Sequence, residues 1–300
     1  MKPMDLHGVF APIPTPFDRD EQVDEVKLRA ACARLAASPL TGLVVLGSTG
    51  EAVLLDEDES DRVVAFARDA WPSGRPFIVG TGRESTNATI RAGRRAAALG
   101  ADAVLVRTPG FYKSQMHTDV FVRHYTAVAD ASPVPVLLYN FTAVTGVNLL
   151  PAAVSKLAAH PNIIGIKESG GDIAQITEFV AGTPKGFNVL AGSSTTFNAA
   201  MGAGVTGGIL ALSCVLPDAC VRLYELARAG KTSEASALQD RLQPLAKLVG
   251  SMHGIAGLKA ALKLAGCDVG GPRSPLAPVS DATVAVLREA LVSFEEVALV

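Results

Sequence analysis

The hydrophobic positions of the chain fall into short apolar runs that recur at intervals of roughly 25–35 residues. Each run is rich in β-branched residues, and most are followed by a turn of glycine or serine and then by an amphipathic segment. The runs are apolar throughout rather than alternating, which is typical of strands buried on both faces of a parallel sheet. Eight such runs predict strands at Val9–Pro14, Gly42–Leu46, Pro76–Gly80, Ala103–Arg107, Val134–Tyr139, Ile163–Lys167, Phe187–Ala191 and Gly207–Leu212.

The segments between these runs have the hydrophobic spacing and the end signals of helices. Three acidic residues at positions 56–58 suit the start of one helix, and Gly100 suits the end of another. Strands that alternate with helices in this way predict an α/β fold, a closed (β/α)₈ barrel (TIM barrel). An open doubly wound sheet is the weaker alternative, because no GxGxxG pattern follows the first strand. The clearest helices are expected at Asp24–Ala37, Glu59–Ala70, Ser85–Leu99 and Pro151–Ala159.

The alternation of strands and helices ends near residue 228. The remaining sequence predicts helices without strands between them, and Gly270–Pro278 reads as a linker rich in glycine and proline. We therefore divide the chain into a barrel over residues 1–228 and a C-terminal helical extension over residues 229–300. The extension is too small to be expected to fold alone, so we expect it to pack on the barrel or on a neighbouring subunit. Its helices are expected at Thr232–Leu248, Ile255–Leu264 and Asp281–Val297.

Composition and charge limit the classes of function. Hydrophobic residues make up 49% of the chain and charged residues 19%, which suits a large core and argues against disorder. The net charge is −2 without a basic stripe, so nucleic acid is not an expected partner. No apolar run is long enough to span a bilayer and no signal peptide is recognisable, so no membrane association is expected. The cysteines have no paired spacing and are predicted to be buried or partly buried free thiols of a cytoplasmic protein: Cys32, Cys214, Cys220 and Cys267.

Lys167 carries the clearest chemical signal. In barrels of this type the active site lies at the C-terminal ends of the strands, and Lys167 ends the apolar run that begins at Ile163. Burial disfavours the ammonium form of a lysine, and only the neutral amine attacks a carbonyl. The position therefore suits Schiff-base chemistry. The alternative is a lysine that extends to the rim or pairs with Glu168 or Glu51.

Two other strand ends supply groups that would complete such a site. The segment Gly47–Gly50 could form a nest of backbone N–H groups for a carboxylate or phosphate, with two hydroxyls beside it. A turn that simply requires small residues is the alternative there. Tyr139 could relay a proton, or could merely fill the mouth of the barrel with its ring. Together the three strand ends would provide a nucleophile, an anion cradle and a hydroxyl relay.

Other candidate residues carry less information. His117 and His124 are not expected to bind a metal, because no carboxylate or cysteine completes a ligand set. Arg83 and Arg107 could bind an acid group, but ion pairs at the rim are the simpler interpretation. The segments Gly192–Ser193 and Gly207–Gly208 follow or begin the last two strands, where many barrels bind phosphate. A phosphorylated substrate therefore remains an alternative.

Three motifs, Gly47–Glu51, Tyr139–Asn140 and Ile164–Glu168, occur in this order with large spacings. As a set they resemble the dihydrodipicolinate synthase / N-acetylneuraminate lyase family of pyruvate-dependent class I aldolases, over nearly the whole chain. The resemblance implies no metal and no organic cofactor, pyruvate as a small-molecule substrate, and a homotetramer. It implies catalytic roles for Lys167, Tyr139, Thr49 and Tyr112, and substrate-binding roles for Ser48, Thr49, Gly50, Ser169, Gly192, Ser193 and Ile209.

Departures from the family pattern narrow the substrate. Dihydrodipicolinate synthases carry an arginine after the tyrosine strand, where this chain has Val144. Sialic acid lyases carry an acidic pair after the seventh strand, where this chain has Ser194 and Thr195. The segments 124–130, 167–172 and 190–193 look most like those of 4-hydroxy-2-oxoglutarate aldolases. The loop Gly110–Tyr112 aligns with the tyrosine that family tetramers insert into a neighbouring site, so either Phe111 or Tyr112 occupies that position.

The resemblance implies a lyase that makes or cleaves a C–C bond between pyruvate and a small aldehyde, with 4-hydroxy-2-oxoglutarate as the best candidate substrate. A condensation of the dihydrodipicolinate synthase type and an imine-forming dehydratase of a 2-keto-3-deoxy sugar acid are the alternatives. A non-catalytic protein that binds a 2-oxo acid is the weakest, because binding alone does not need a reactive lysine. An unrelated phosphate-binding barrel would leave the three motifs unexplained.

Overall fold

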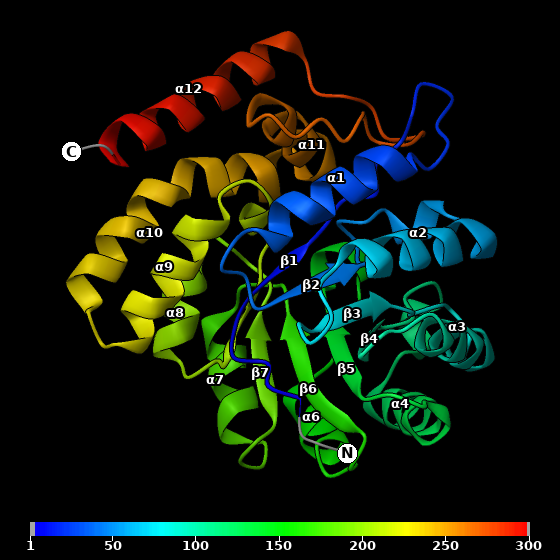
Figure 1. Ribbon diagram of the computed structural model, residues 1–300. Helices are drawn as coiled ribbons and strands as arrows, with labels where there is room; N and C mark the ends of the chain where they lie inside the picture. Colours follow the sequence, from blue (N-terminus) through cyan, green and yellow to red (C-terminus); the bar gives the residue numbers. More distant parts are fainter. Residues whose placement is uncertain (1–3, 299–300) are drawn as a thin grey trace.

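The computed structural model describes residues 4–298 and shows a closed barrel of eight parallel strands (Figure 1). Each strand pairs with the next in the chain, and β1 closes the barrel by pairing with β8. The predicted (β/α)₈ fold is therefore confirmed. The strands are β1 (Gly8–Pro12), β2 (Gly42–Val45), β3 (Phe77–Gly80), β4 (Ala103–Arg107), β5 (Val136–Asn140), β6 (Ile163–Glu168), β7 (Asn188–Ala191) and β8 (Gly207–Ile209).

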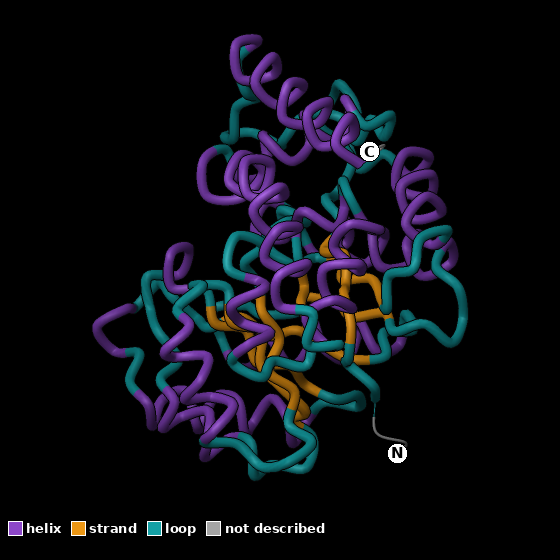
Figure 2. Tube along the Cα trace, turned by 90° about the vertical axis from the view of Figure 1, so that its left-hand side faces the viewer, coloured by secondary structure: helices purple, strands orange, loops and turns teal. Residues whose placement is uncertain are grey.

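Helices surround the strands on the outside of the barrel (Figure 2). The α-helices are α1 (Glu25–Ala36), α2 (Glu57–Ala70), α3 (Thr86–Ala98), α4 (Thr118–Ala131), α5 (Thr142–Thr145), α6 (Pro151–Leu157), α7 (Ile173–Ala181), α8 (Phe197–Gly202), α9 (Pro217–Arg228), α10 (Thr232–Lys247), α11 (Gly254–Leu264) and α12 (Asp281–Ala298). Three 3₁₀ turns and one π-helical turn complete the set: η1 (Ala52–Leu54), η2 (Lys113–Gln115), η3 (Ala211–Cys214) and η4 (Leu248–Met252).

Local signals account for the main differences from the predicted boundaries. α2 begins at Glu57 rather than Glu59, because Asp56 is its N-cap and accepts a hydrogen bond from the Glu59 N–H at 2.8 Å. The Glu59 carboxylate accepts in return from the Asp56 N–H at 3.0 Å, which completes a capping box. β8 is shorter than predicted: the chain leaves the barrel after Ile209, and the 3₁₀ turn η3 begins at Ala211.

The interior of the barrel is filled by side chains from alternate strand positions. In β2, for example, Val44 packs inside while Leu43 and Val45 pack between the sheet and the helices. Tyr139 belongs to the same interior cluster, at the opposite end from Leu6 of the N-terminal segment. The other fully enclosed members include Phe10, Ile78, Leu105, Leu137, Leu190 and Ile209.

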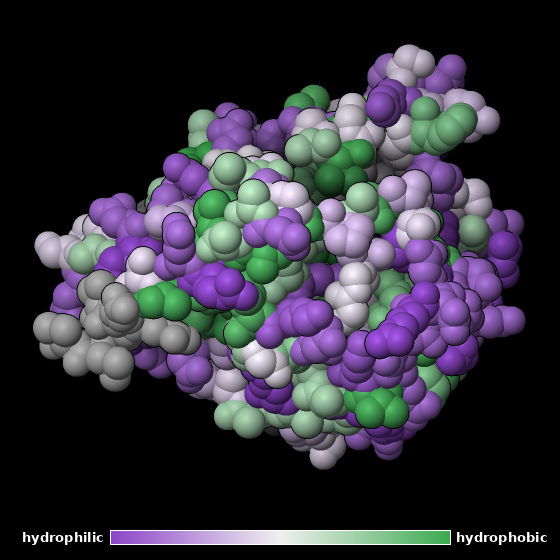
Figure 3. All heavy atoms as spheres, turned by 90° about the horizontal axis from the view of Figure 1, so that it is seen from above, coloured by the Kyte–Doolittle hydropathy of each residue, from purple (hydrophilic) through white to green (hydrophobic). Residues whose placement is uncertain are grey.

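The helices α10, α11 and α12 lie together on one side of the barrel (Figure 1). Seen from above, hydrophilic and hydrophobic side chains are interspersed over this part of the surface (Figure 3). Within the described residues no strand follows β8. α11 packs against η3, which belongs to the barrel segment. The division of the chain into a barrel and an extension between residues 228 and 229 remains a proposal.

Two further sequence predictions can be compared with the structure. Cys32, Cys214 and Cys220 are buried and Cys267 is partly buried, all as free thiols, as predicted. Burial raises the pKa of the Cys32 and Cys220 thiols to about 12, so neither is a reactive thiolate. In residues 4–298 no helix combines the length and hydrophobicity that crossing a membrane requires.

Candidate active site

Lys167 and Tyr139 lie side by side at the C-terminal ends of β6 and β5. The two residues are register partners in the parallel ladder, and each is only 4% exposed. The Lys167 Nζ atom lies 4.5 Å from the centroid of the Tyr139 ring. Lys167 forms no ion pair with any described residue. The alternative of a lysine paired with Glu168 or Glu51 is therefore wrong, because both carboxylates are engaged elsewhere.

The loop after β2 brings the third predicted group to this pair. Ser48 Oγ lies 2.9 Å from the Tyr139 hydroxyl, so the two are hydrogen-bonded. The backbone N–H groups of Ser48 and Thr49 donate to no acceptor among residues 4–298. Gly50 closes the turn with a hydrogen bond from its N–H to the Gly47 carbonyl at 3.0 Å. Two unpaired N–H groups beside a hydroxyl form an arrangement that can hold a carboxylate.

The loops after β6 and β7 enclose Lys167 on the other side. Gly192 packs so closely that a Cβ atom there would lie 2.9 Å from Lys167 Cε and 1.9 Å from Ser169 Oγ. The Ser169 hydroxyl is buried without a hydrogen-bond partner in the described structure, which leaves it free for a ligand. Ser193 Oγ bonds to Thr195 Oγ1 at 2.9 Å. Ile209 belongs to the same buried cluster inside the barrel as Tyr139.

Tyr112 stands apart from these residues. It lies in the loop after β4 and is 69% exposed, with the neighbouring Phe111 ring packed edge-on at 5.1 Å. The Glu84 carboxylate anchors this loop by accepting hydrogen bonds from the N–H groups of Gly110 and Phe111 at 3.0 and 2.9 Å. Within one chain, the structure therefore brings Lys167, Tyr139 and Ser48 together but leaves Tyr112 at the surface.

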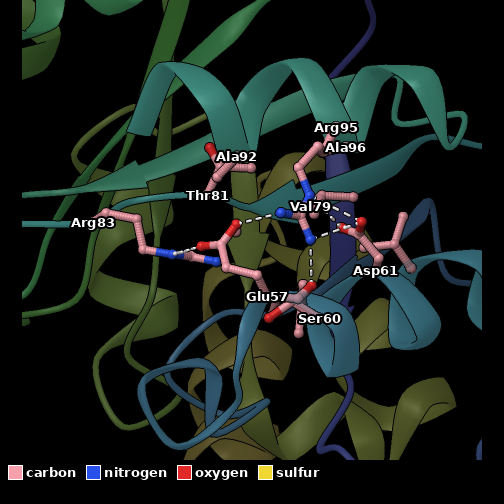
Figure 4. A pocket seen from close by; sticks show the side chains of 12 residues that line it. Glu57, Ser60, Asp61, Val79, Thr81, Arg83, Ala92, Arg95 and Ala96 are labelled. Atoms are coloured by element: carbon pink, nitrogen blue, oxygen red, sulfur yellow. Dashed lines mark hydrogen bonds and ion pairs between the residues drawn. The ribbon is translucent and has the colours of Figure 1, made fainter. Parts of the chain in front are cut away.

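Arg83 and Arg107 both form ion pairs, as expected from the simpler of the two interpretations of these residues. Arg107 binds Glu84 at 2.7 Å, and Arg83 binds Glu57 at 3.2 Å. Figure 4 shows the second pair within a polar cluster between α2 and α3, in which Arg95 binds Glu57 and Asp61. The cavity there measures about 10 Å³, which is space for about one water molecule and none for a substrate.

The histidine pair is not brought together as a metal site. His117 is exposed at the start of α4, whereas His124 is buried and pairs through Nδ1 with Thr86 Oγ1 at 2.9 Å. Within the part of the chain that the structure describes, no cluster of three or more His, Cys, Asp or Glu side chains could hold a metal ion.

Sequence reasoning missed a buried polar network behind Lys167. Glu168 points away from the barrel interior and accepts hydrogen bonds from Asn140 Nδ2 at 2.7 Å and from Gln175 Nε2 at 3.2 Å. Asn140 Oδ1 accepts in turn from the Leu149 N–H at 2.9 Å. Burial raises the pKa of Glu168, against the effect of these donors. The network links β5 to β6 directly beside Tyr139 and Lys167. It could have been inferred from the sequence, because side chains alternate along a strand and the residues after Tyr139 and Lys167 must face the outside of the barrel.

Comparisons with known proteins agree with this geometry. Residues 5–293 match the dihydrodipicolinate synthetase family. A 4-hydroxy-tetrahydrodipicolinate synthase from an Exiguobacterium species is 37% identical, over 97% of this chain and 98% of the relative. A probable mitochondrial 4-hydroxy-2-oxoglutarate aldolase from Emericella nidulans is 38% identical, over 94% of this chain and 93% of the relative.

Solved structures lead to the same group. The dihydrodipicolinate synthase of Thermotoga maritima superposes with a TM-score of 0.93 at 31% identity, covering 97% of this chain and 99% of that one. The enzyme from Acinetobacter baumannii, solved in complex with pyruvate, superposes with a TM-score of 0.91 at 29% identity and the same coverage. The chain is thus a carbon–carbon lyase, and it belongs to the dihydrodipicolinate synthetase family.

Proposed function

We propose that this protein forms a Schiff base between Lys167 and a 2-oxo acid such as pyruvate, and uses it to make or cleave a C–C bond with a small aldehyde. The observation that carries the proposal is the buried Lys167 amine beside Tyr139, whose hydroxyl contacts Ser48 in a loop with two unpaired N–H groups. A relative in the same family is described in complex with pyruvate, which supports this substrate. A homotetramer in the cytoplasm, without a metal or organic cofactor, completes the proposal.

The residues can be given roles in that reaction. The Lys167 amine would attack C2 of the 2-oxo acid, and the carbonyl oxygen would leave as water. The protonated imine then accepts the electron pair of the C3–C4 bond as the C4 hydroxyl loses its proton, and the enamine that remains is protonated at C3 and hydrolysed by water to release pyruvate and the free amine. Tyr139 would relay that proton, supported by Ser48 or Thr49. The loop N–H groups of Ser48 and Thr49 would hold the substrate carboxylate, while Ser169, Gly192, Ser193 and Ile209 would line the rest of the site.

The aldehyde partner is proposed to be glyoxylate, so that 4-hydroxy-2-oxoglutarate is cleaved to pyruvate and glyoxylate. The relative named as a probable 4-hydroxy-2-oxoglutarate aldolase supports this choice. Val144 counts against the synthase instead: this side chain is exposed on α5 and offers no cation for the carboxylate of that enzyme's second substrate. The synthase activity named for the Exiguobacterium relative is the second candidate. An imine-forming dehydratase of a sugar acid is the third.

Borohydride reduction in the presence of pyruvate tests the imine. We expect a reduced pyruvate adduct that maps to Lys167 by mass spectrometry, and no adduct in the Lys167→Met variant. A folded protein without an adduct, under conditions in which the borohydride is active, would contradict all three imine-forming activities. Product analysis then separates the aldolase from the dehydratase: pyruvate with glyoxylate indicates the aldolase, whereas elimination of water indicates the dehydratase.

A further inference from the structure

The helical extension contacts the loop that is proposed to bind the substrate carboxylate. We propose that Lys259 of α11 is a positioning residue for catalysis: through Glu51 it holds the β2 loop, residues 46–51, in the conformation that presents the Ser48 and Thr49 N–H groups. This inference rests on the proposed function, because it assumes that the β2 loop binds the carboxylate of a 2-oxo acid. It assigns the extension a role in the chemistry and not only in folding.

The contact is a fully buried ion pair. Lys259 Nζ lies 2.7 Å from Glu51 Oε1, and each side chain is only 1% exposed. The same nitrogen donates hydrogen bonds to the carbonyl oxygens of Thr15 at 2.7 Å and Gly271 at 2.8 Å. The ammonium group thus donates to two carbonyl oxygens and forms its ion pair with Glu51 as a third, charged neighbour. Thr15 Oγ1 in turn donates to the Gly50 carbonyl at 2.6 Å, so the lysine contacts the β2 loop by two routes.

The segment that follows α11 holds the same glutamate from its other oxygen. Glu51 Oε2 accepts a hydrogen bond from the Arg273 N–H at 2.8 Å, and Arg273 Nη1 donates to the Leu54 carbonyl at 2.9 Å. The Arg273 guanidinium also pairs with Glu59 at 2.6 Å. The extension therefore contacts both the end of the β2 loop and the η1 turn that directly follows it.

The backbone of the β2 loop needs such external contacts. Leu46 and Glu51, which bracket it, adopt left-handed conformations with φ of 55° and 54°, unusual for residues other than glycine. Such a conformation is strained in a residue with a Cβ atom and persists only where its surroundings impose it. At the first end, β3 approaches so closely that a Cβ on Gly80 would lie 1.8 Å from the Leu46 carbonyl oxygen. At the second end, the contacts come from Lys259 and Arg273.

Charge gives the pair a further consequence for an anionic substrate. Glu51 is adjacent to Gly50 and two residues from Thr49, so an unpaired carboxylate there would repel a carboxylate bound at the loop. Lys259 neutralises it at 2.7 Å. Removing Lys259 alone would leave this carboxylate buried and unpaired, so we expect such a variant to lose stability as well as affinity for the substrate.

The test compares three variants for the pyruvate concentration that gives half-maximal borohydride-trapped adduct on Lys167. We expect Lys259→Met to raise this concentration by at least about tenfold, equivalent to about 1.4 kcal/mol, while saturating pyruvate still yields the adduct. The double variant Lys259→Met, Glu51→Gln removes the unpaired charge and keeps a side-chain oxygen for the Arg273 N–H. It should recover most of the lost affinity. Lys263→Met makes the same change at an exposed position of α11 and should behave as wild type.

Each outcome supports or overturns the inference. A wild-type adduct together with an unchanged half-maximal concentration in folded Lys259→Met overturns it and leaves the proposed function standing. No adduct in the wild type overturns both. Should Lys259→Met fail to fold, hydrogen exchange on the wild type decides: pyruvate must slow exchange at the Arg273 N–H as well as in the β2 loop. Protection of the loop alone would contradict the coupling, because such coupling is reciprocal.

Discussion

Two loops at the mouth of the barrel, those after β2 and β4, contrast in how they are held. The β2 loop is buried, strained at both ends and tied by a buried ion pair to a distant segment of the chain. The β4 loop, residues 108–116, exposes Phe111 and Tyr112 and is anchored by Glu84, whose carboxylate side chain is 47% exposed. The β2 loop is thus held by contacts within the chain, whereas the β4 loop exposes two aromatic rings at the surface.

The contrast separates two kinds of catalytic contribution. Groups that must be placed before the substrate arrives need rigid support, and Ser48 and Tyr139 have it through their mutual hydrogen bond. No hydrogen bond from a described residue supports the Tyr112 side chain in this way, as expected for a group that acts in the site of a neighbouring subunit. The variants below are ordered by the size of the expected effect.

Tyr139→Phe should have the largest effect. Loss of the hydroxyl that contacts Ser48 removes the proposed proton relay, so turnover should fall by about 10²–10⁴-fold. Steady-state kinetics measure this, with Tyr125→Phe as the matched control. Tyr125 is also buried, but its hydroxyl donates to the Val106 carbonyl outside the site. That control should lose about 1 kcal/mol of stability and keep its turnover. Similar turnover in both variants would argue against the relay.

Gly80→Ala should displace the β2 loop from the other end. The new Cβ would meet the Leu46 carbonyl oxygen at 1.8 Å, and the backbone must shift to relieve that contact. We expect half-maximal imine trapping to need about 10–10² times more pyruvate, equivalent to about 1.4–2.7 kcal/mol. Gly93→Ala in α3, where a Cβ would meet nothing within 4 Å, serves as the control. It should stabilise the helix by up to about 1 kcal/mol without changing trapping.

Tyr112→Phe should have a smaller effect on turnover, about tenfold, at the low end for one acid–base group. The measurement is turnover at saturating substrate, accompanied by the oligomeric state in solution. Phe111→Leu is the comparison, and it should retain turnover if Tyr112 is the relay. The reverse order of the two variants would assign the inter-subunit position to Phe111 and exclude a hydroxyl relay from this loop.

His124 should affect stability without affecting chemistry. It lies in α4, and burial lowers its pKa to about 4. Between pH 6.5 and 4 the unfolded chain therefore binds more protons than the folded one, so stability present at neutral pH is lost as the pH falls. The loss from this group is at most about 3 kcal/mol. His124→Asn, which can preserve the Thr86 contact, should show a flatter pH dependence in chemical denaturation. Parallel curves would contradict the assignment.

The strands and the core of the site were predictable because their signals are local. Apolar runs of strand length indicate a parallel barrel, and a barrel places all its C-terminal strand ends at one rim. The meeting of Lys167, Tyr139 and Ser48 follows from that topology. The network of Glu168 with Asn140 was missed because its members lie on the outer face, where polarity at a single position resembles an ordinary rim residue.

The sequence by itself therefore determined the barrel, the helical nature of the extension and the three strand ends that meet at the site. Only the tertiary structure decided how the loops are supported. Nothing local relates Lys259 to Glu51 or Glu84 to the N–H groups of Gly110 and Phe111. These partners are brought together by the packing of segments that are far apart in the chain. The local sequence around a polar residue does not indicate which buried charge will contact it. Hydrophobic periodicity specifies elements, whereas the pairing of buried polar groups depends on where those elements finally pack.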